Sequence, residues 1–384
     1  MLKWIGAFAA LALAGGAVYF FVIAPVGFDT RANAVLEGGA HPVSDEAQAL
    51  HDSIAVADLH ADTLLWMRDP LKRQQRGQTD VPRLLEGGVR LQVFTAVTKS
   101  PRGQNYERNE ADTDQLTLLL QAQRWPLRTW GSLYERALYQ GARLERLAQD
   151  SGGDLILVRT TRDLERALAS DVLGGVFGIE GAHALEGDLD NLDRLYDAGL
   201  RLVGLHHFFD NELGGSLHGL SRDGLTPFGR AVVEKAAGKR MIIDVAHSSE
   251  QTVLEVLALT DRPVIVSHTG LKGHCDSPRN ISDEVMKAVA AGGGLVGVGF
   301  WDGAVCDPAP ASVAAAIVYA IDLLGTEHVA LGSDFDGTVT TAFDASELAV
   351  LTQALMDAGL DEATIRAVMG GNAIRFFMEH LPPQ

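Results

Sequence analysis

The chain has 384 residues, the length of two to three average domains or of one large α/β barrel. Apolar residues make up 47% of it and charged residues 21%, which excludes an intrinsically disordered or collagen-like chain. The 32 basic and 50 acidic residues give a formal net charge of −18, so nucleic acid is not expected as a partner. Two cysteines exclude a disulfide-rich scaffold and a four-cysteine zinc site, and leave one disulfide open.

The N-terminal segment differs from the rest of the chain. Residues Trp4 to Val26 are uncharged and mostly apolar, and Lys3 precedes them. A helix of this length is long enough to span the hydrocarbon core of a bilayer, which is about 30 Å thick, so residues 1–27 are expected to be a membrane anchor. A cleaved export signal and a buried soluble helix are the alternatives. Lys3 favours a cytoplasmic amino terminus, which would place the body in the periplasm or the extracellular space.

After a linker over residues 28–46, residues 47–384 are expected to form one domain in which short apolar runs alternate with helical periodicity. Eight such units predict a (β/α)8 TIM-type barrel, preceded by the transmembrane helix. A doubly wound sheet is disfavoured because residues 58–62 lack the glycine fingerprint of that fold. A ninth run, over residues 155–158, is expected to be an accessory strand. The eight predicted barrel strands are Ile54–Leu59, Val89–Val97, Gly175–Ile179, Leu200–Leu205, Met241–Ala246, Val264–Ser267, Leu295–Phe300 and Val329–Gly332.

Three predicted helices have recognisable ends. Thr226 precedes a first-turn proline and predicts the N-cap of a helix that ends at Gly238. Ser248 and Gln251 have the spacing of a capping box. Ser282 is followed by two acidic residues, which favours another helix start.

Residues 98–153 are expected to be a helical insertion after the second strand, positioned over the catalytic face. Core packing is the favoured interpretation of its aromatic residues, with a part in the substrate pocket as the alternative. These residues are Trp125, Trp130, Tyr134 and Tyr139.

Ionisable side chains stand near the carboxyl ends of six of the eight predicted strands. In a barrel these ends converge on one face, where the active site lies. Burying so many ionisable groups together without a cation would be costly, so the cluster indicates bound metal. Imidazole and carboxylate ligands favour Zn²⁺, and Mn²⁺, Co²⁺ and Fe²⁺ are left open. The residues are His60, Asp62, Glu180, His206, His207, His247, His268 and Asp334.

Their order along the strands indicates how two ions could share the ligands. His60 and Asp62 point to the same side of an extended segment and could bind one ion. His247 and His268 follow consecutive strands and could hold a second ion, and Glu180 lies between these pairs, so that its two oxygens could bridge the ions. Two ions about 3.5–4 Å apart would generate hydroxide from a bound water and polarise a carbonyl. The expected reaction is hydrolysis of an amide, ester or lactam.

Six segments with these residues follow one another along the chain. They are Asp58-Leu59-His60-Ala61-Asp62-Thr63, Gly178-Ile179-Glu180-Gly181-Ala182-His183, Asp244-Val245-Ala246-His247, Ser267-His268-Thr269, Pro278-Arg279-Asn280 and Gly332-Ser333-Asp334-Phe335-Asp336-Gly337. In sequence and order they closely resemble the motifs of the membrane dipeptidase (renal dipeptidase, peptidase M19) family, from about Ile54 to Phe377. The resemblance implies a binuclear zinc dipeptidase on a barrel of the metal-dependent amidohydrolase kind. It assigns His60 and Asp62 to the first Zn²⁺, His247 and His268 to the second, and Glu180 to both.

The same resemblance implies three further roles. His207 matches the histidine that hydrogen-bonds the scissile carbonyl oxygen of the substrate. Arg279 matches the arginine that binds the free carboxylate of the substrate. Asp334 matches the carboxylate that takes a proton from the bridging water and passes it to the leaving amine. The neighbouring His206, His183 and Asp336 are not assigned to catalysis.

The two cysteines, Cys275 and Cys306, are 31 positions apart and follow the sixth and seventh predicted strands. By resemblance they form a disulfide, which would stabilise the fold by about 3–4 kcal/mol. Two free thiols in a reducing cytosol are the alternative. A disulfide would agree with a body outside the cytoplasm.

The resemblance implies a zinc-dependent dipeptidase with two Zn²⁺ per chain that hydrolyses dipeptides, including those with a C-terminal D-residue, by a metal-bridging hydroxide. The first alternative is another binuclear amidohydrolase, such as a lactonase or β-lactam hydrolase. Many such enzymes use a carboxylated lysine, and none of the seven lysines here ends a central strand near Glu180. The second alternative is a catalytically silent extracytoplasmic binding domain, against which the complete ligand set argues. A homodimer is left open.

Overall fold

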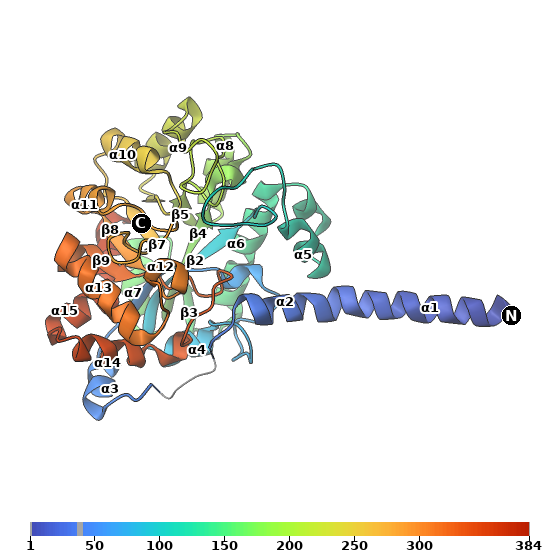
Figure 1. Ribbon diagram of the computed structural model, residues 1–384, viewed down its shortest axis with the longest axis horizontal. Coiled ribbons are helices and arrows are strands. Elements are labelled where there is room, and N and C mark those ends of the chain that lie inside the picture. The colour runs from blue at the N-terminus through green and yellow to red at the C-terminus, as the bar shows by residue number, and fades with distance from the viewer. Residues whose placement is uncertain (1, 37–40, 384) are drawn as a thin grey trace.

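The computed structural model describes residues 2–36 and 41–383 (Figure 1). Nine parallel strands form one sheet in the order β2-β1-β9-β8-β7-β6-β5-β4-β3. An additional pairing of β2 with β4 closes eight of them into a barrel and leaves β3 outside the ring, so the predicted barrel and its accessory strand are confirmed. The strands are β1 (Val56–Ala61), β2 (Val89–Val97), β3 (Leu155–Leu157), β4 (Leu173–Glu180), β5 (Leu200–Gly204), β6 (Ile242–Asp244), β7 (Ile265–Thr269), β8 (Leu295–Val298) and β9 (Val329–Leu331).

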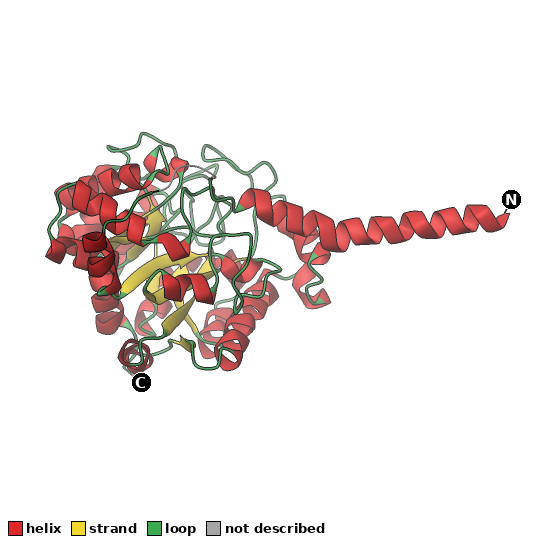
Figure 2. Cartoon of the chain, turned by 90° about the horizontal axis from the view of Figure 1, so that it is seen from below, coloured by secondary structure: helices red, strands yellow, loops and turns green. Residues whose placement is uncertain are grey.

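Helices surround the barrel, as Figure 2 shows. Those of the body are α3 (Asp45–Asp52), α4 (Val81–Glu86), α5 (Leu116–Ala122), α6 (Leu133–Asp150), α7 (Thr161–Ala169), α8 (Asp190–Asp197), α9 (Pro227–Gly238), α10 (Glu250–Leu259), α11 (Asp283–Ala291), α12 (Asp302–Val305), α13 (Pro310–Leu324), α14 (Ala349–Asp357), α15 (Glu362–Arg366) and α16 (Asn372–His380).

The helix caps follow the sequence in two of the three predicted cases. Thr226 caps α9, which ends at Gly238, and Ser282 precedes α11. The capping box predicted for Ser248 is wrong, because Ser249 caps α10 and its hydroxyl accepts a hydrogen bond from the Thr252 amide at 3.0 Å. Ser248 Oγ lies 3.0 Å from His206 Nδ1 instead, so this hydroxyl hydrogen-bonds a buried imidazole and does not cap the helix.

In β6 and β7, the strand face that starts apolar becomes polar towards the carboxyl end. One buried apolar cluster takes a side chain from every barrel strand and is completed by Phe376 and Phe377 of α16. Ile242 and Ile265 belong to this cluster. Side chains alternate along a strand, so Asp244 and Ser267, two positions further on, lie on the same face. The barrel interior therefore carries a dry apolar layer beneath a polar one.

A long N-terminal helix projects from the barrel (Figures 1 and 2). It consists of α1 (Leu2–Val18), a π-helical turn η1 (Tyr19–Ile23) and α2 (Ala24–Ala32). Among the described residues, this is the one helix long and apolar enough to cross a membrane. The division at residues 27 and 46 into anchor, linker and domain stays a prediction.

The end of this helix is docked onto the body. Asp29 and Asn33 are 2% and 1% exposed, although they fall in the predicted linker. Arg68 connects Asp29 to the barrel, since its Nε lies 3.0 Å from Asp29 Oδ2 and its Nη2 lies 2.7 Å from Asp336 Oδ1. Asn33 Oδ1 also accepts from the Thr338 amide at 3.0 Å. These contacts join α2 to the loop after β9.

Candidate active site

The polar ends of the barrel strands meet at one cavity of about 450 Å³. His60 lies in β1, Glu180 is the last residue of β4 and His268 lies in β7, whereas the other predicted site residues follow their strands directly or in the next loop. All of them are buried. The cavity is lined by Asp62, Glu180, His207, His247, Arg279 and Asp334, together with residues of the insertion and of the loop after β9.

Glu180 is the centre of this cluster. Its Oε1 lies 3.2 Å from His247 Nε2, 3.4 Å from His268 Nε2 and 3.6 Å from His60 Nε2. His60 Nε2 is in turn 3.7 Å from Asp62 Oδ1. The side chains predicted from strand order to surround Glu180 are thus close enough to it to share bound cations.

Three sets of side chains in the described residues are spaced closely enough to hold a metal ion. One set, His60, Asp62 and Glu180, agrees with the ligands expected for the first ion. The other two differ from the expected second site, because they group Glu180 with His207 and His247, and His60 with His268 and Asp334. Since His247 Nε2 and His268 Nε2 are 2.9 Å apart, the division of ligands between two ions stays a prediction.

A single hydroxyl orients two of the imidazoles. Ser267 Oγ donates to Asp244 Oδ2 at 2.6 Å and lies 3.1 Å from His60 Nδ1 and 2.9 Å from His268 Nδ1. A hydroxyl has one hydrogen and two lone pairs, so Ser267 can only accept from both rings. Each Nδ1 then carries a hydrogen, and each Nε2 lone pair faces Glu180, as metal binding requires. These residues therefore fit a metal centre.

The electrostatics of His247 and His268 agree with that fit. Burial lowers the pKa of His247 and His268 well below the ordinary value, so both rings are neutral and keep a lone pair. Burial and the charge of Asp62 raise the pKa of Glu180, and burial raises the pKa of Asp334 to about 8. Burial opposes the charge on His60, but Glu180, Asp62 and Asp334 outweigh it and raise the pKa of His60 to about 10. A bound cation would favour the ionised form of these carboxyl groups and would displace the second proton from His60 Nε2, which frees the lone pair of that nitrogen for the metal.

Arg279 occupies the side of the cavity next to the imidazoles. It is 1% exposed, its Nη2 donates to the His268 carbonyl oxygen at 3.0 Å, and its guanidinium lies 5.3 Å from the ring centre of Trp301. Its Nη1 has no hydrogen-bond partner among the described residues. A buried guanidinium with donors to spare is a site for an anionic group.

Comparison with known proteins settles the family. The family model of the membrane dipeptidases (peptidase family M19) matches residues 44–381. The chain belongs to this family. Dipeptidase 3 of Mus musculus is 28% identical over an alignment of 366 residues that covers 87% of this chain and 66% of that protein.

Solved structures agree with this membership. A crystal structure of dipeptidase AC, a metallopeptidase of family M19, is 25% identical, has a TM-score of 0.72 and matches 86% of this chain and all (100%) of that chain. A metallopeptidase from Rhodobacter sphaeroides, liganded with a phosphinate mimic of L-Ala-D-Ala, is 25% identical, with a TM-score of 0.71 and coverage of 85% and 99%. This M19 protein is thus a metallo-dipeptidase, a hydrolase that acts on peptides.

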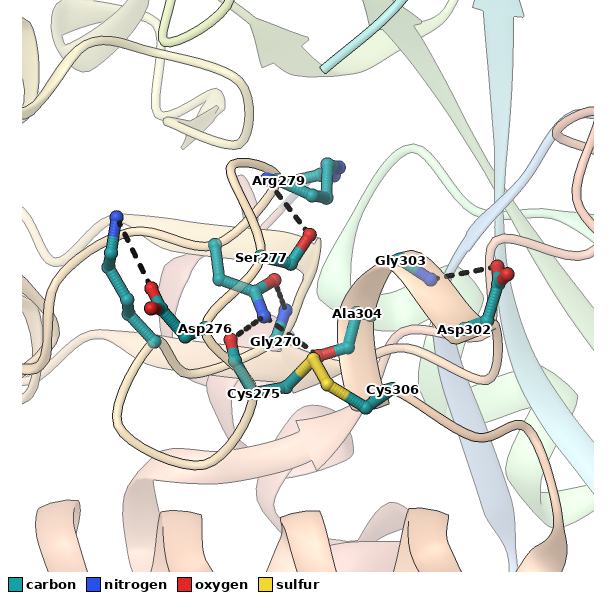
Figure 3. The surroundings of a disulfide bond; sticks show 11 residues. Gly270, Cys275, Asp276, Ser277, Arg279, Asp302, Gly303, Ala304 and Cys306 are labelled. Carbon is teal, nitrogen blue, oxygen red and sulfur yellow. Dashed lines mark hydrogen bonds and ion pairs between the residues drawn. A yellow bond between two sulfur atoms is a disulfide. The ribbon is translucent and has the colours of Figure 1, made fainter. Parts of the chain in front are cut away.

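The disulfide between Cys275 and Cys306 is present in this dipeptidase (Figure 3). It joins the loop after β7 to the end of α12. Asn280 reinforces the connection, because its Nδ2 donates to the carbonyl oxygens of Cys275 at 2.9 Å and Ala304 at 2.8 Å. Arg279 lies in the same loop, where its amide donates to Ser277 Oγ at 3.2 Å. The disulfide therefore restrains the segment that carries Arg279.

The insertion reaches the active site of the dipeptidase, as expected from its position. Gln104 and Tyr106 line the cavity, and Tyr106 Oη accepts from Trp301 Nε1 at 3.0 Å. The core packing expected for its aromatic residues holds for Trp125, which is 4% exposed, and not for Trp130, which is 37% exposed.

Sequence reasoning missed several residues of the site. Thr95 donates to Asp62 Oδ1 at 2.6 Å, and Ser333 donates to Asp58 Oδ2 at 2.7 Å. Ser267 and Asp244 stood within the quoted motifs without a role. A hydroxyl next to a ligand on an interior strand face is the signal that could have found Ser267, whereas the contact of Thr95 joins two strands and has no local signal.

Proposed function

We propose that this metallo-dipeptidase uses two Zn²⁺ ions, the first bound by His60 and Asp62, the second by His247 and His268, with Glu180 shared. The observation that carries the proposal is the position of Glu180 Oε1, which lies 3.2–3.6 Å from three imidazole nitrogens. When bound, the ions would acidify a water molecule and polarise the scissile carbonyl.

Three side chains would handle the substrate around this centre. Arg279 binds the free carboxylate through the Nη1 and Nη2 donors of its planar fork. His207 Nε2 faces the cavity, while its Nδ1 hydrogen is directed to the Lys99 carbonyl oxygen at 3.1 Å. Burial lowers the pKa of His207 to about 4, so the free ring is neutral. Donation from Nε2 to the carbonyl oxygen of the substrate therefore needs a second proton on the ring, which the negative charge developing on that oxygen stabilises.

Asp334 would move the proton. Burial raises its pKa to about 8 and bound cations would lower it from there, so near neutral pH its carboxylate can accept a proton. In the proposed reaction Asp334 takes a proton from the attacking water and returns it to the leaving nitrogen. Its Oδ1 lies 3.9 Å from His60 Nε2, beside the proposed first ion site.

We further propose that dipeptides with a C-terminal D-residue are among the substrates. The support is the Rhodobacter sphaeroides metallopeptidase, whose bound ligand mimics L-Ala-D-Ala. Cleavage of lactones or β-lactams is not favoured by a specific feature of the described residues.

We propose that the N-terminal helix anchors the enzyme in a membrane with the catalytic domain outside the cytoplasm. The apolar helix over residues 4–32 and the disulfide support this location, because disulfides persist in oxidising compartments.

A panel of L–L and L–D dipeptides tests the proposed activity. Metal-stripped enzyme should be inactive, and activity should return as Zn²⁺ is added, reaching its maximum near two equivalents. Metal analysis of the purified enzyme should agree. Full activity in the stripped protein would refute the metal mechanism, and saturation at one equivalent would refute the two-ion site.

A further inference from the structure

Large apolar side chains are exposed on the insertion next to the N-terminal helix. Leu118 of α5 is 60% exposed, and Leu127 and Trp130 of the short helix η3 (Leu127–Trp130) are 74% and 37% exposed. Leu127 is the most exposed large apolar side chain described outside the N-terminal helix. We call Leu118, Leu127 and Trp130, together with Arg124, the insertion patch. A soluble surface seldom exposes so many large apolar side chains within so short a segment.

The insertion patch lies next to one part of the N-terminal helix, residues 19–28. An apolar cavity of about 320 Å³ lies between them, with Tyr19, Phe20 and Phe28 on the side of the helix and Leu118 and Leu119 on the side of α5. Arg124 lies over the ring of Phe21, 5.2 Å from its centre. Figure 1 shows α5 beside the point where the helix leaves the body.

This part of the helix would lie at the outer surface of a bilayer that the helix spans. Counted from Trp4, twenty residues of helix span about 30 Å and end near Ile23. The aromatic residues 19–21 therefore fall in the last turns of the membrane span, where the hydrocarbon gives way to headgroups and aromatic side chains are enriched. Because α5 contacts the helix there, the insertion patch is brought to the same level.

The charge of this segment also suits a lipid surface. The chain as a whole carries a net charge of −18, yet residues 115–134 contain two arginines and no acidic residue. Arg128 is paired with Glu135 at 2.8 Å, whereas the exposed Arg124 has no acidic partner among the described residues. A guanidinium beside apolar side chains fits an anionic headgroup above acyl chains.

We propose that the insertion patch lies in the outer interface of the bilayer, with its apolar side chains among the headgroups and upper acyl chains and Arg124 against lipid phosphate. This inference rests on the proposed anchoring by the N-terminal helix. The N-terminal helix and the insertion patch are then two adjacent contacts with the bilayer, and together they hold the barrel at a fixed tilt relative to the membrane plane. Phe28 shares a small cavity with Asp62 and His207, so the tilt keeps the mouth of the active site next to the membrane surface.

Spin labels on the full chain test the proposal in vesicles of phosphatidylcholine and phosphatidylglycerol. The two native cysteines are disulfide-bonded, so a single introduced cysteine takes the label. Leu127→Cys probes the patch, and Leu11→Cys probes the anchor. Leu254→Cys on α10 is the matched control, an exposed leucine (48%) on another side of the barrel. The depth of each label in the bilayer is measured from two collision rates, one with oxygen, which enters the lipid, and one with a nickel complex, which stays in water.

We expect labels at positions 11 and 127 to collide more often with oxygen, and the label at position 254 to collide more often with the nickel complex. Replacing phosphatidylglycerol by phosphatidylcholine should make position 127 shallower, and Arg124→Gln should abolish this dependence. If position 11 is in lipid while position 127 behaves like position 254, the patch proposal is wrong and the anchoring stands. An aqueous position 11 would instead refute the anchoring. A short label–label distance at position 127 between two copies would assign the patch to a dimer and overturn the proposal.

Discussion

Replacement of Arg279 by alanine tests how the enzyme recognises its substrate. The guanidinium is buried and has Nη1 donors without a partner in the described structure, so we expect it to bind the free carboxylate of a dipeptide. The variant removes this contact, whereas a substrate with a C-terminal amide offers the same scissile bond without the charge.

The expected loss follows from the donors that are available. A hydrogen bond to a charged group contributes about 1.5–3 kcal/mol, so a contact of two such bonds with a carboxylate should contribute roughly 3–6 kcal/mol. Since about 1.4 kcal/mol corresponds to a factor of ten, kcat/KM for the free dipeptide should fall about 10²–10⁴-fold. The neutral amide can accept one ordinary hydrogen bond, worth about 1 kcal/mol, and its kcat/KM should fall about fivefold.

The assay compares kcat/KM for one dipeptide and its C-terminal amide in both enzymes, at equal metal content. Arg201→Ala is the matched control, because Arg201 is also buried (7% exposed) but binds the backbone of Arg159 at the start of α7. It should leave the ratio between the two substrates unchanged. An equal loss on both substrates in Arg279→Ala would refute the carboxylate contact and leave Arg279 a structural role.

Three further variants test other parts of the site. Asp334→Asn should retain bound metal and lose most turnover, and an undiminished kcat would remove Asp334 from proton transfer. Ser267→Ala takes the acceptor from the Nδ1 hydrogens of His60 and His268, so metal affinity in a chelator competition should fall about 10–100-fold; unchanged affinity would show that the hydroxyl does not orient the rings. Replacing Cys275 and Cys306 by serine removes a 31-residue loop closure, which should lower the free energy of unfolding by about 3–4 kcal/mol and the melting temperature by roughly 5 °C, whereas an unchanged melting temperature would contradict this estimate.

The sequence by itself determined the barrel and the composition of the site. Alternation of apolar runs and helical periodicity is a local property, and parallel strands in a closed ring bring their carboxyl ends to one face whatever the details of packing. That is why His60, Glu180 and His268, far apart in the chain, could be placed together before their distances were known.

Only the tertiary structure decided how these groups are held. Ser248 and Ser249 are adjacent candidates for the cap of α10. Ser249 is the cap, while Ser248 contacts His206 in the loop after β5. The shared Ser267 hydroxyl and the docking of α2 through Asp29 likewise depend on partners distant in sequence. Local sequence patterns indicate which helix or strand a segment can form. Side-chain hydrogen bonds between segments depend instead on atomic positions that are fixed only when the whole barrel closes.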